Sequence, residues 1–211
     1  MNSDITAPAR TCPPGADTHA KRLTWWSELE PQWRAAFQAA SFGHTNQPSY
    51  EDLEALWQTT VLRFAGPRAF HPNLPFELSN CSGLAGMSNL EILVLTNHHL
   101  DSIAEVAGMP NLKSLFVNNN AIQSLEALSG LTQLTQLYAQ INQITSIEPL
   151  RNLTGLTEVY INFNALKTLN GLTRKHANIL KSFYCLPNDQ LPDRETLRVE
   201  RTLGIRCRSL H

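Results

Sequence analysis

The sequence predicts an α/β repeat protein with helices at both ends. Two observations predict this fold. First, apolar residues return at a constant interval of 22 residues between Leu90 and Leu172, and a fixed period of this length is typical of proteins built from stacked supersecondary units. Second, apolar residues at helical spacing flank the repeats, upstream around Trp33 and downstream of Asp193.

Four segments define the repeat, and each follows the pattern L-x-x-L-x-L-x-x-N-x-L with few departures. They are LEILVLTNHHL from Leu90, LKSLFVNNNAI from Leu112, LTQLYAQINQI from Leu134 and LTEVYINFNAL from Leu156. The period fixes several positions in every repeat, whereas a single L-x-x-L would predict nothing.

This pattern resembles the leucine-rich repeat family, in particular the short 22-residue type found in the bacterial internalins. The resemblance implies a solenoid, with a parallel β-sheet on the concave face and 3₁₀ or turn segments on the convex face. It also implies a ladder of asparagine side chains that hydrogen-bond backbone groups of neighbouring units. The residues at this position are Asn120, Asn142, Asn164 and, in a less regular fifth unit, Asn188.

The first regular repeat has His98 in place of the asparagine. Together with His99 it could indicate a metal site, but no third ligand follows at a recognisable spacing. We therefore expect His98 to replace asparagine in the ladder, and we predict neither a metal nor a cofactor.

The repeats define the expected domain organisation. Four regular repeats at 90–177 lie within about six units at 59–190. Residues 22–58 are expected to form a helical N-terminal cap, and residues 191–211 a C-terminal capping helix and tail. Residues 1–21 are rich in Pro, Ala and Thr without periodicity, so we expect them to be disordered.

Both caps are predicted from apolar stripes and helix-end signals. One amphipathic helix, with Pro31 near its first turn, is predicted from the stripe formed by Trp26, Leu29, Trp33 and Phe37. A second helix should begin after Ser49, which can form a capping box with Asp52. The C-terminal helix should run from about Asp193 to a stop at Gly204.

A column of aromatic residues is the clearest functional signal. Strand side chains alternate, so the residue between the two core positions of each strand points to the concave surface. Neighbouring repeats carry Phe116, Tyr138, Tyr160 and Tyr184 at this position. Further candidates on the same surface follow each strand: Asn118, Gln140, Asn162 and Phe163. Exposed aromatic side chains mark interaction sites, although rings on neighbouring strands can also stack merely to stabilise the sheet.

The sequence favours a non-catalytic module that binds a protein or peptide on this aromatic face. The balance of 17 Lys+Arg against 18 Asp+Glu argues against nucleic acid and membrane surfaces as partners, and a glycan is less favoured than a protein. No catalytic motif is present, and Cys185 falls at a core position, where a thiol is usually inert. The alternatives are a secreted bacterial effector that acts on a host protein, and a homodimeric structural protein.

The expected location is cytoplasmic. No apolar stretch is long enough to span a bilayer, and the polar start of the sequence has no signal-peptide core. Secretion by a non-classical route stays open. The four cysteines show no C-x-x-C spacing, so we expect free thiols.

Overall fold

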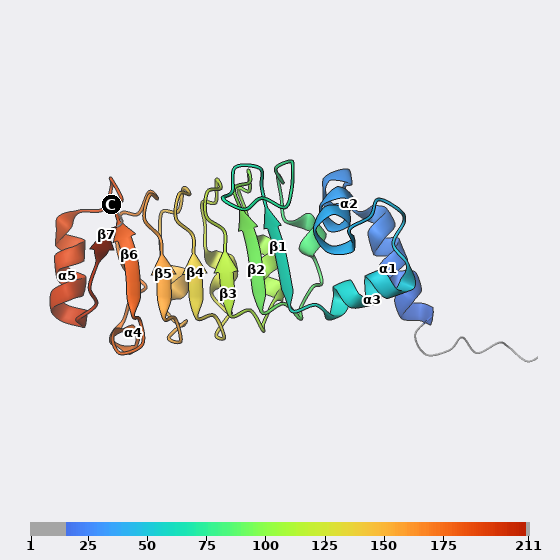
Figure 1. Cartoon of the computed structure of the whole chain (residues 1–211). Helices are drawn as coiled ribbons and strands as arrows, with labels where there is room; N and C mark the ends of the chain where they lie inside the picture. The colour runs from blue at the N-terminus through green and yellow to red at the C-terminus, as the bar shows by residue number, and fades with distance from the viewer. Residues whose placement is uncertain (1–15, 210–211) are drawn as a thin grey trace, which may run out of the picture.

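The computed structural model describes residues 16–209, which form one elongated parallel sheet with helices at both ends (Figure 1). The seven strands lie side by side in the order in which they occur in the chain. They are β1 Val61–Ala65, β2 Ile92–Thr96, β3 Ser114–Phe116, β4 Gln136–Tyr138, β5 Glu158–Tyr160, β6 Ser182–Leu186 and β7 Arg208–Ser209. This arrangement confirms the predicted solenoid, with one strand more than the repeats predict, since β7 follows the C-terminal helix.

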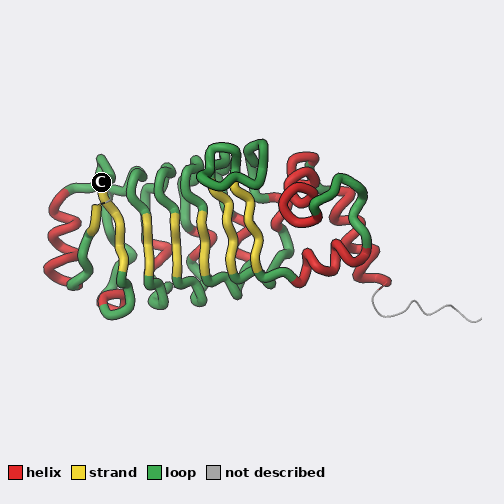
Figure 2. The backbone as a smooth tube through the Cα atoms, viewed as in Figure 1, coloured by secondary structure: helices red, strands yellow, loops and turns green. Residues whose placement is uncertain are grey.

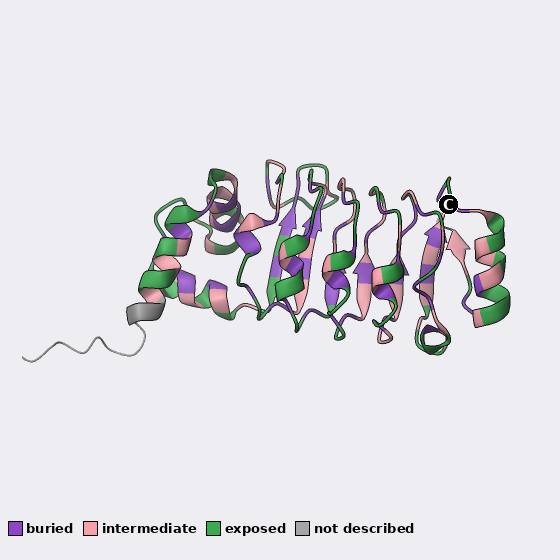
Figure 3. Cartoon of the chain, turned by 180° about the vertical axis from the view of Figure 1, so that it is seen from behind, coloured by how far each residue is buried: buried purple, intermediate pink, exposed green. Residues whose placement is uncertain are grey.

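Short 3₁₀ segments cover the convex face of the sheet (Figures 1 and 3). They are Ser82–Leu84, Ala104–Gly108, Glu126–Leu128 and Glu148–Leu150. The trace in Figure 2 shows each unit as one strand, a loop and a return on the far side. The segments bury Val106, Leu128 and Leu150 completely, so the core lies between the sheet and these turns.

The period of the sequence sets the register of the sheet. Leu93 lies opposite Leu115, and Leu115 lies opposite Leu137. All three side chains are fully buried. Each residue of a strand therefore lies beside the equivalent residue of the next repeat. The residues between the core positions form columns in the same way, and these columns lie on the concave face.

The asparagine at the end of each repeat bonds backbone groups of adjacent units. The side-chain carbonyl of Asn120 accepts the backbone N–H of Leu100 at 3.2 Å, and its NH₂ group donates to the carbonyl of Leu95 at 2.8 Å. In the fifth unit the Asn188 carbonyl accepts the backbone N–H of Leu166 at 3.2 Å. These side chains satisfy backbone groups inside the coil that no strand neighbour can reach.

His98 makes the same two kinds of contact as the asparagines. Its Nδ1 accepts the backbone N–H of Leu78 at 3.1 Å, and its Nε2 lies 3.2 Å from the carbonyl oxygen of Phe64. An acceptor at Nδ1 and a donor at Nε2 together require the neutral imidazole. Burial lowers the pKa of His98, in agreement with a neutral ring.

Acid should therefore destabilise the protein through His98. Because its pKa is lower in the folded chain, the unfolded chain binds this proton first, so stability is full above about pH 6.5 and falls below it. We expect the melting temperature to fall between about pH 7.5 and about pH 5.5, and His98→Asn to reduce this fall. Part of the fall should remain, since burial also lowers the pKa of His176. Equal falls in both proteins would contradict this role.

Helices and a π turn close the N-terminal end of the core. They are α1 Ala16–Glu28, α2 Pro31–Phe37, the π turn Gln38–Phe42 and α3 Tyr50–Gln58. The prediction of one helix through Pro31 is wrong, because Pro31 lacks an N–H and begins α2 at its first position. The apolar stripe is nevertheless buried. Ser49 and Asp52 form the predicted capping box of α3.

The predicted tail overlaps the first of these helices. Residues 16–21 belong to α1, whereas residues 1–15 lie outside the described residues. The disorder expected for residues 1–21 is therefore wrong for its last part, where the chain packs as a helix beside α3.

The C-terminal end is closed by α5 Asp193–Leu203, with Gly204 in the left-handed conformation as its C-cap, as predicted. A short helix, α4 Arg174–Ala177, precedes β6, and the spacing between repeats grows from 22 residues to the 24 between Leu156 and Leu180. Glu195 of α5 accepts the backbone N–H of Leu169 at 3.0 Å. The nearby Arg198 guanidinium and this bond lower the pKa of Glu195 to about 2, so the carboxylate stays charged against the last repeat.

Candidate functional site

The four predicted aromatic residues form one continuous stack on the concave face. Phe116, Tyr138, Tyr160 and Tyr184 come from β3, β4, β5 and β6, where the register places them opposite one another. Successive ring centroids are 4.7, 4.5 and 4.6 Å apart, and successive ring planes differ by 19°, 10° and 13°. We call these residues the aromatic column. Each ring covers the face of the next, so the column presents ring edges and hydroxyl groups, and all four side chains are only partly buried.

At its C-terminal end the column contacts an arginine side chain that the repeat pattern does not predict. The Arg208 guanidinium lies 5.7 Å from the ring centre of Tyr184, within the range of a cation–π interaction. Arg208 lies opposite Tyr184 because β7 pairs with β6. No sequence signal points to it, since β7 follows a helix and not a repeat.

A carboxylate lies beside the column on the amino-terminal side of the strands. Tyr138 donates its hydroxyl hydrogen to Glu158 of the next repeat. Burial and this hydrogen bond raise the pKa of Tyr138, so the phenol stays protonated and fixed toward Glu158. In the neighbouring position Ser114 donates to Gln136 at 2.7 Å. Polar side chains therefore link the repeats along this side of the column.

A row of polar side chains lies on the other side of the column and differs in part from the prediction. It consists of Thr96, Asn118, Gln140 and Asn162. Asn118 and Gln140 are partly exposed, but Asn162 is only 1% exposed, so its predicted place on an open surface is wrong. Beside it, Phe163 donates its N–H to the carbonyl of Pro187 in the next unit at 2.6 Å. The side-chain oxygens of Gln140 and Asn162 are buried without a hydrogen-bond partner among the described residues.

The residues that follow this row form a rim in an unusual backbone conformation. Asn97, Asn119, Ile141 and Phe163 have φ angles of 60°, 58°, 58° and 56°. Asparagine tolerates this left-handed region, whereas it costs other L-residues about 1–2 kcal/mol and is rarest for β-branched residues. Ile141 and Phe163 are also 48% and 50% exposed. Phe163 is thus available on the surface, and Ile141, one repeat before it, belongs to the same set.

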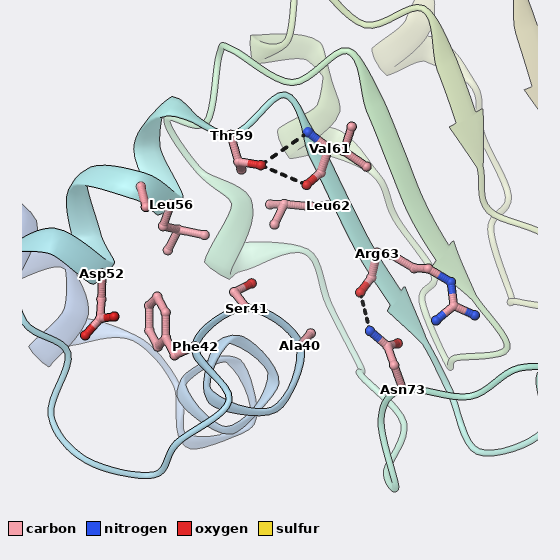
Figure 4. Close-up of a pocket in the computed structure, with 11 residues that line it drawn as sticks. Ala40, Ser41, Phe42, Asp52, Leu56, Thr59, Val61, Leu62, Arg63 and Asn73 are labelled. Atoms are coloured by element: carbon pink, nitrogen blue, oxygen red, sulfur yellow. Dashed lines mark hydrogen bonds between the residues drawn. The ribbon is translucent and has the colours of Figure 1, made fainter.

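A hollow of about 520 Å³ lies between the N-terminal cap and β1 (Figure 4). Phe42 and Leu56 contribute apolar walls. Several of its polar groups already stabilise the fold: Asp52 accepts the N–H that begins the capping box, and Thr59 and Asn73 bond backbone groups of β1. These contacts cover the outer edge of β1, as an edge strand requires. The hollow is therefore a seam between the cap and the sheet.

The described residues show no cluster typical of metal binding, and their buried thiols are poorly reactive. Within residues 16–209, no three His, Cys, Asp or Glu side chains are close enough to hold a metal ion. Cys185 is fully buried, and its contact with Cys207, together with burial, raises its pKa. Burial also raises the pKa of Cys81 to about 12. Such thiols are poor nucleophiles. In the same part of the chain, no helix has the length and apolar character needed to cross a membrane.

Comparison with known proteins finds leucine-rich repeat models that match the repeat region of this chain. Family models described as leucine rich repeat and as leucine rich repeats in two copies match residues 88–144 and 132–174. No curated protein matches the chain. Solved structures similar to it include internalin C2 from Listeria monocytogenes, at 19% identity over 78% of this chain and 86% of that one, with a TM-score of 0.44.

Two further solved structures are similar over most of this chain. An internalin (inlF) from Listeria monocytogenes is 18% identical over 82% of this chain and 56% of that one, with a TM-score of 0.47. A leucine-rich repeat protein from Leptospira interrogans is 17% identical over 80% of this chain and 45% of that one, with a TM-score of 0.52. The chain spans about half the length of these two proteins, and the Leptospira structure supports the fold alone.

Proposed function

Because residues 88–174 match leucine-rich repeat models and the chain folds as a leucine-rich repeat solenoid, we propose that it is a protein-interaction module whose partner docks on the concave face over β3 to β6. The aromatic column carries this proposal. Four partly exposed rings stand in a row on an otherwise polar sheet surface, with ring centroids 4.5 to 4.7 Å apart. Tyrosine offers rigid apolar area and a hydroxyl group in one side chain, which suits a protein interface.

The stacking of the rings favours a protein over a glycan. A sugar packs against the open face of an aromatic ring, but here the inner faces are covered by neighbouring rings, at plane angles of 10° to 19°. The edges and hydroxyl groups that remain can contact apolar and polar groups of a partner in alternation. The column therefore supports a protein or peptide as the bound molecule.

Replacing Tyr138 and Tyr160 together with alanine should abolish detectable binding. Truncating central aromatic residues of an interface typically costs more than about 2 kcal/mol, which corresponds to at least about 30-fold in affinity. The full-length wild type and this variant would serve as baits for a lysate of the source organism, after circular dichroism shows that both are folded. Titration calorimetry with the captured protein would then give the two affinities.

A conservative variant separates binding from stability. Tyr138→Phe with Tyr160→Phe keeps the stack but removes two hydroxyl groups, and it should retain most of the affinity. If the alanine variant binds the captured protein as well as wild type does, the rings only stabilise the sheet and the proposal is wrong. Light scattering of the same proteins tests the homodimer, because a dimer on this face would dissociate in the alanine variant.

A further inference from the structure

The rim formed by Asn97, Asn119, Ile141 and Phe163 contains two residues that do not suit its backbone conformation. All four residues share the left-handed backbone conformation. In the first two repeats asparagine fills this position, and the Asn119 NH₂ group donates to the Asn97 side-chain oxygen at 2.5 Å. Asparagine thus both tolerates the backbone and links neighbouring repeats. The next two repeats replace it with residues that do neither.

Ile141 and Phe163 lie outside the buried core, where packing would offset this strain. Their side chains are 48% and 50% exposed, although both are large and apolar. The backbone bond of Ile141 is the same as that of Asn119, since the N–H of Ile141 donates to Asn162 just as the N–H of Asn119 donates to Gln140. Residues held in a strained conformation without a structural benefit are typical of functional positions.

The chemistry around this pair indicates what covers it. The rim and the polar row beside it contain no charged side chain, so this part of the surface has none of the Lys and Arg that would attract a nucleic acid or an anionic membrane. An uncharged, apolar patch is therefore the complementary surface.

We infer that Ile141 and Phe163 form an apolar anchor that inserts into an uncharged apolar patch of the protein partner. This inference rests on the proposed function and adds to it the position and chemistry of the specificity-determining contact. The anchor lies three residues beyond Tyr138 and Tyr160 in the same two repeats. One partner surface can therefore contact the column and the anchor together.

Replacing Ile141 and Phe163 together with asparagine tests the inference, because affinity should fall while stability is kept or rises. The probe is a set of peptides selected on full-length wild type from a random library displayed on phage. We expect the selected peptides to be apolar and uncharged, and calorimetry to show at least about tenfold weaker binding to the double variant. The melting temperature should stay equal or rise by about 2–4 °C, since asparagine suits the backbone.

A matched control removes similar apolar surface elsewhere. Ile179 is 42% exposed and follows α4, so Ile179→Asn should bind the peptides as wild type does. A lower melting temperature of the double variant, unchanged affinity, or peptides rich in charged residues would overturn the inference. If the peptides ignore the rim but lose affinity for the Tyr138 and Tyr160 alanine variant, the proposed function stands without the anchor. If neither variant affects them, both proposals fail.

Discussion

Replacing Trp33 with alanine is expected to lower the free energy of unfolding by about 3–5 kcal/mol, the usual cost of deleting a fully buried large aromatic side chain. Trp33 is 0% exposed. Its ring meets Phe64 of β1 edge to face at 5.3 Å, and its Nε1–H donates to Asn80 at 3.1 Å. It therefore joins the N-terminal cap to the first unit. Denaturant unfolding followed by fluorescence and circular dichroism would measure the loss.

Gly83 provides the matching half of a double-mutant cycle. A Cβ atom at Gly83 would lie 2.2 Å from the Trp33 ring, so Gly83→Ala should destabilise wild type by pushing the cap away from the repeats. In the Trp33→Ala background the same change should cost much less, because the space has opened. Equal costs in the two backgrounds would show that the ring does not rest on Gly83, contrary to the structure.

Replacing Asn142 with alanine should cost about 2–4 kcal/mol, since it leaves the buried N–H of Ile122 without an acceptor, at roughly 1–3 kcal/mol, and removes further hydrogen bonds at roughly 0.5–1.5 kcal/mol each. The carbonyls of Val117 and Ala139 keep Asn120 and Asn164 as donors. The Asn142 side chain accepts the N–H of Ile122 at 3.0 Å and donates to the carbonyls of Val117 and Ala139 at 3.0 and 3.2 Å. These groups belong to two consecutive repeats. The loss should therefore weaken their stacking as well as the local turn. Equilibrium unfolding in urea would measure it.

An asparagine on the convex side serves as the control for Asn142. Asn152 is exposed, so Asn152→Ala should change the free energy of unfolding by less than about 0.5 kcal/mol. If Asn142→Ala proved as mild as Asn152→Ala, the ladder would contribute little to the stability of the coil. Hydrogen exchange of the Ile122 amide would locate the effect, because this N–H loses its acceptor in the Asn142 variant.

The repeat period predicts most, but not all, residue positions in the candidate site. Alignment of the repeats is enough to place Phe116, Tyr138, Tyr160 and Tyr184 in one column, because a shift of one repeat places equivalent residues side by side in a parallel sheet. The same alignment puts Asn162 in a column of open positions, and there it fails. The alignment does not predict the burial of Asn162, because the fifth unit beside it departs from the period, and there Phe163 bonds Pro187.

The sequence by itself determined the repeat, the register, the buried core positions, the column, the start of α3 and both ends of α5. Each of these features follows either from the spacing of residues within a short segment or from contact with the adjacent repeat. The repeat period of the sequence predicts such contacts. Only the tertiary structure decided the break at Pro31, the left-handed rim, the burial of Asn162 and the contact of Arg208 with Tyr184. These features depend on segments that share no period, or on the competition between a side chain's preference and the backbone path imposed by its neighbours.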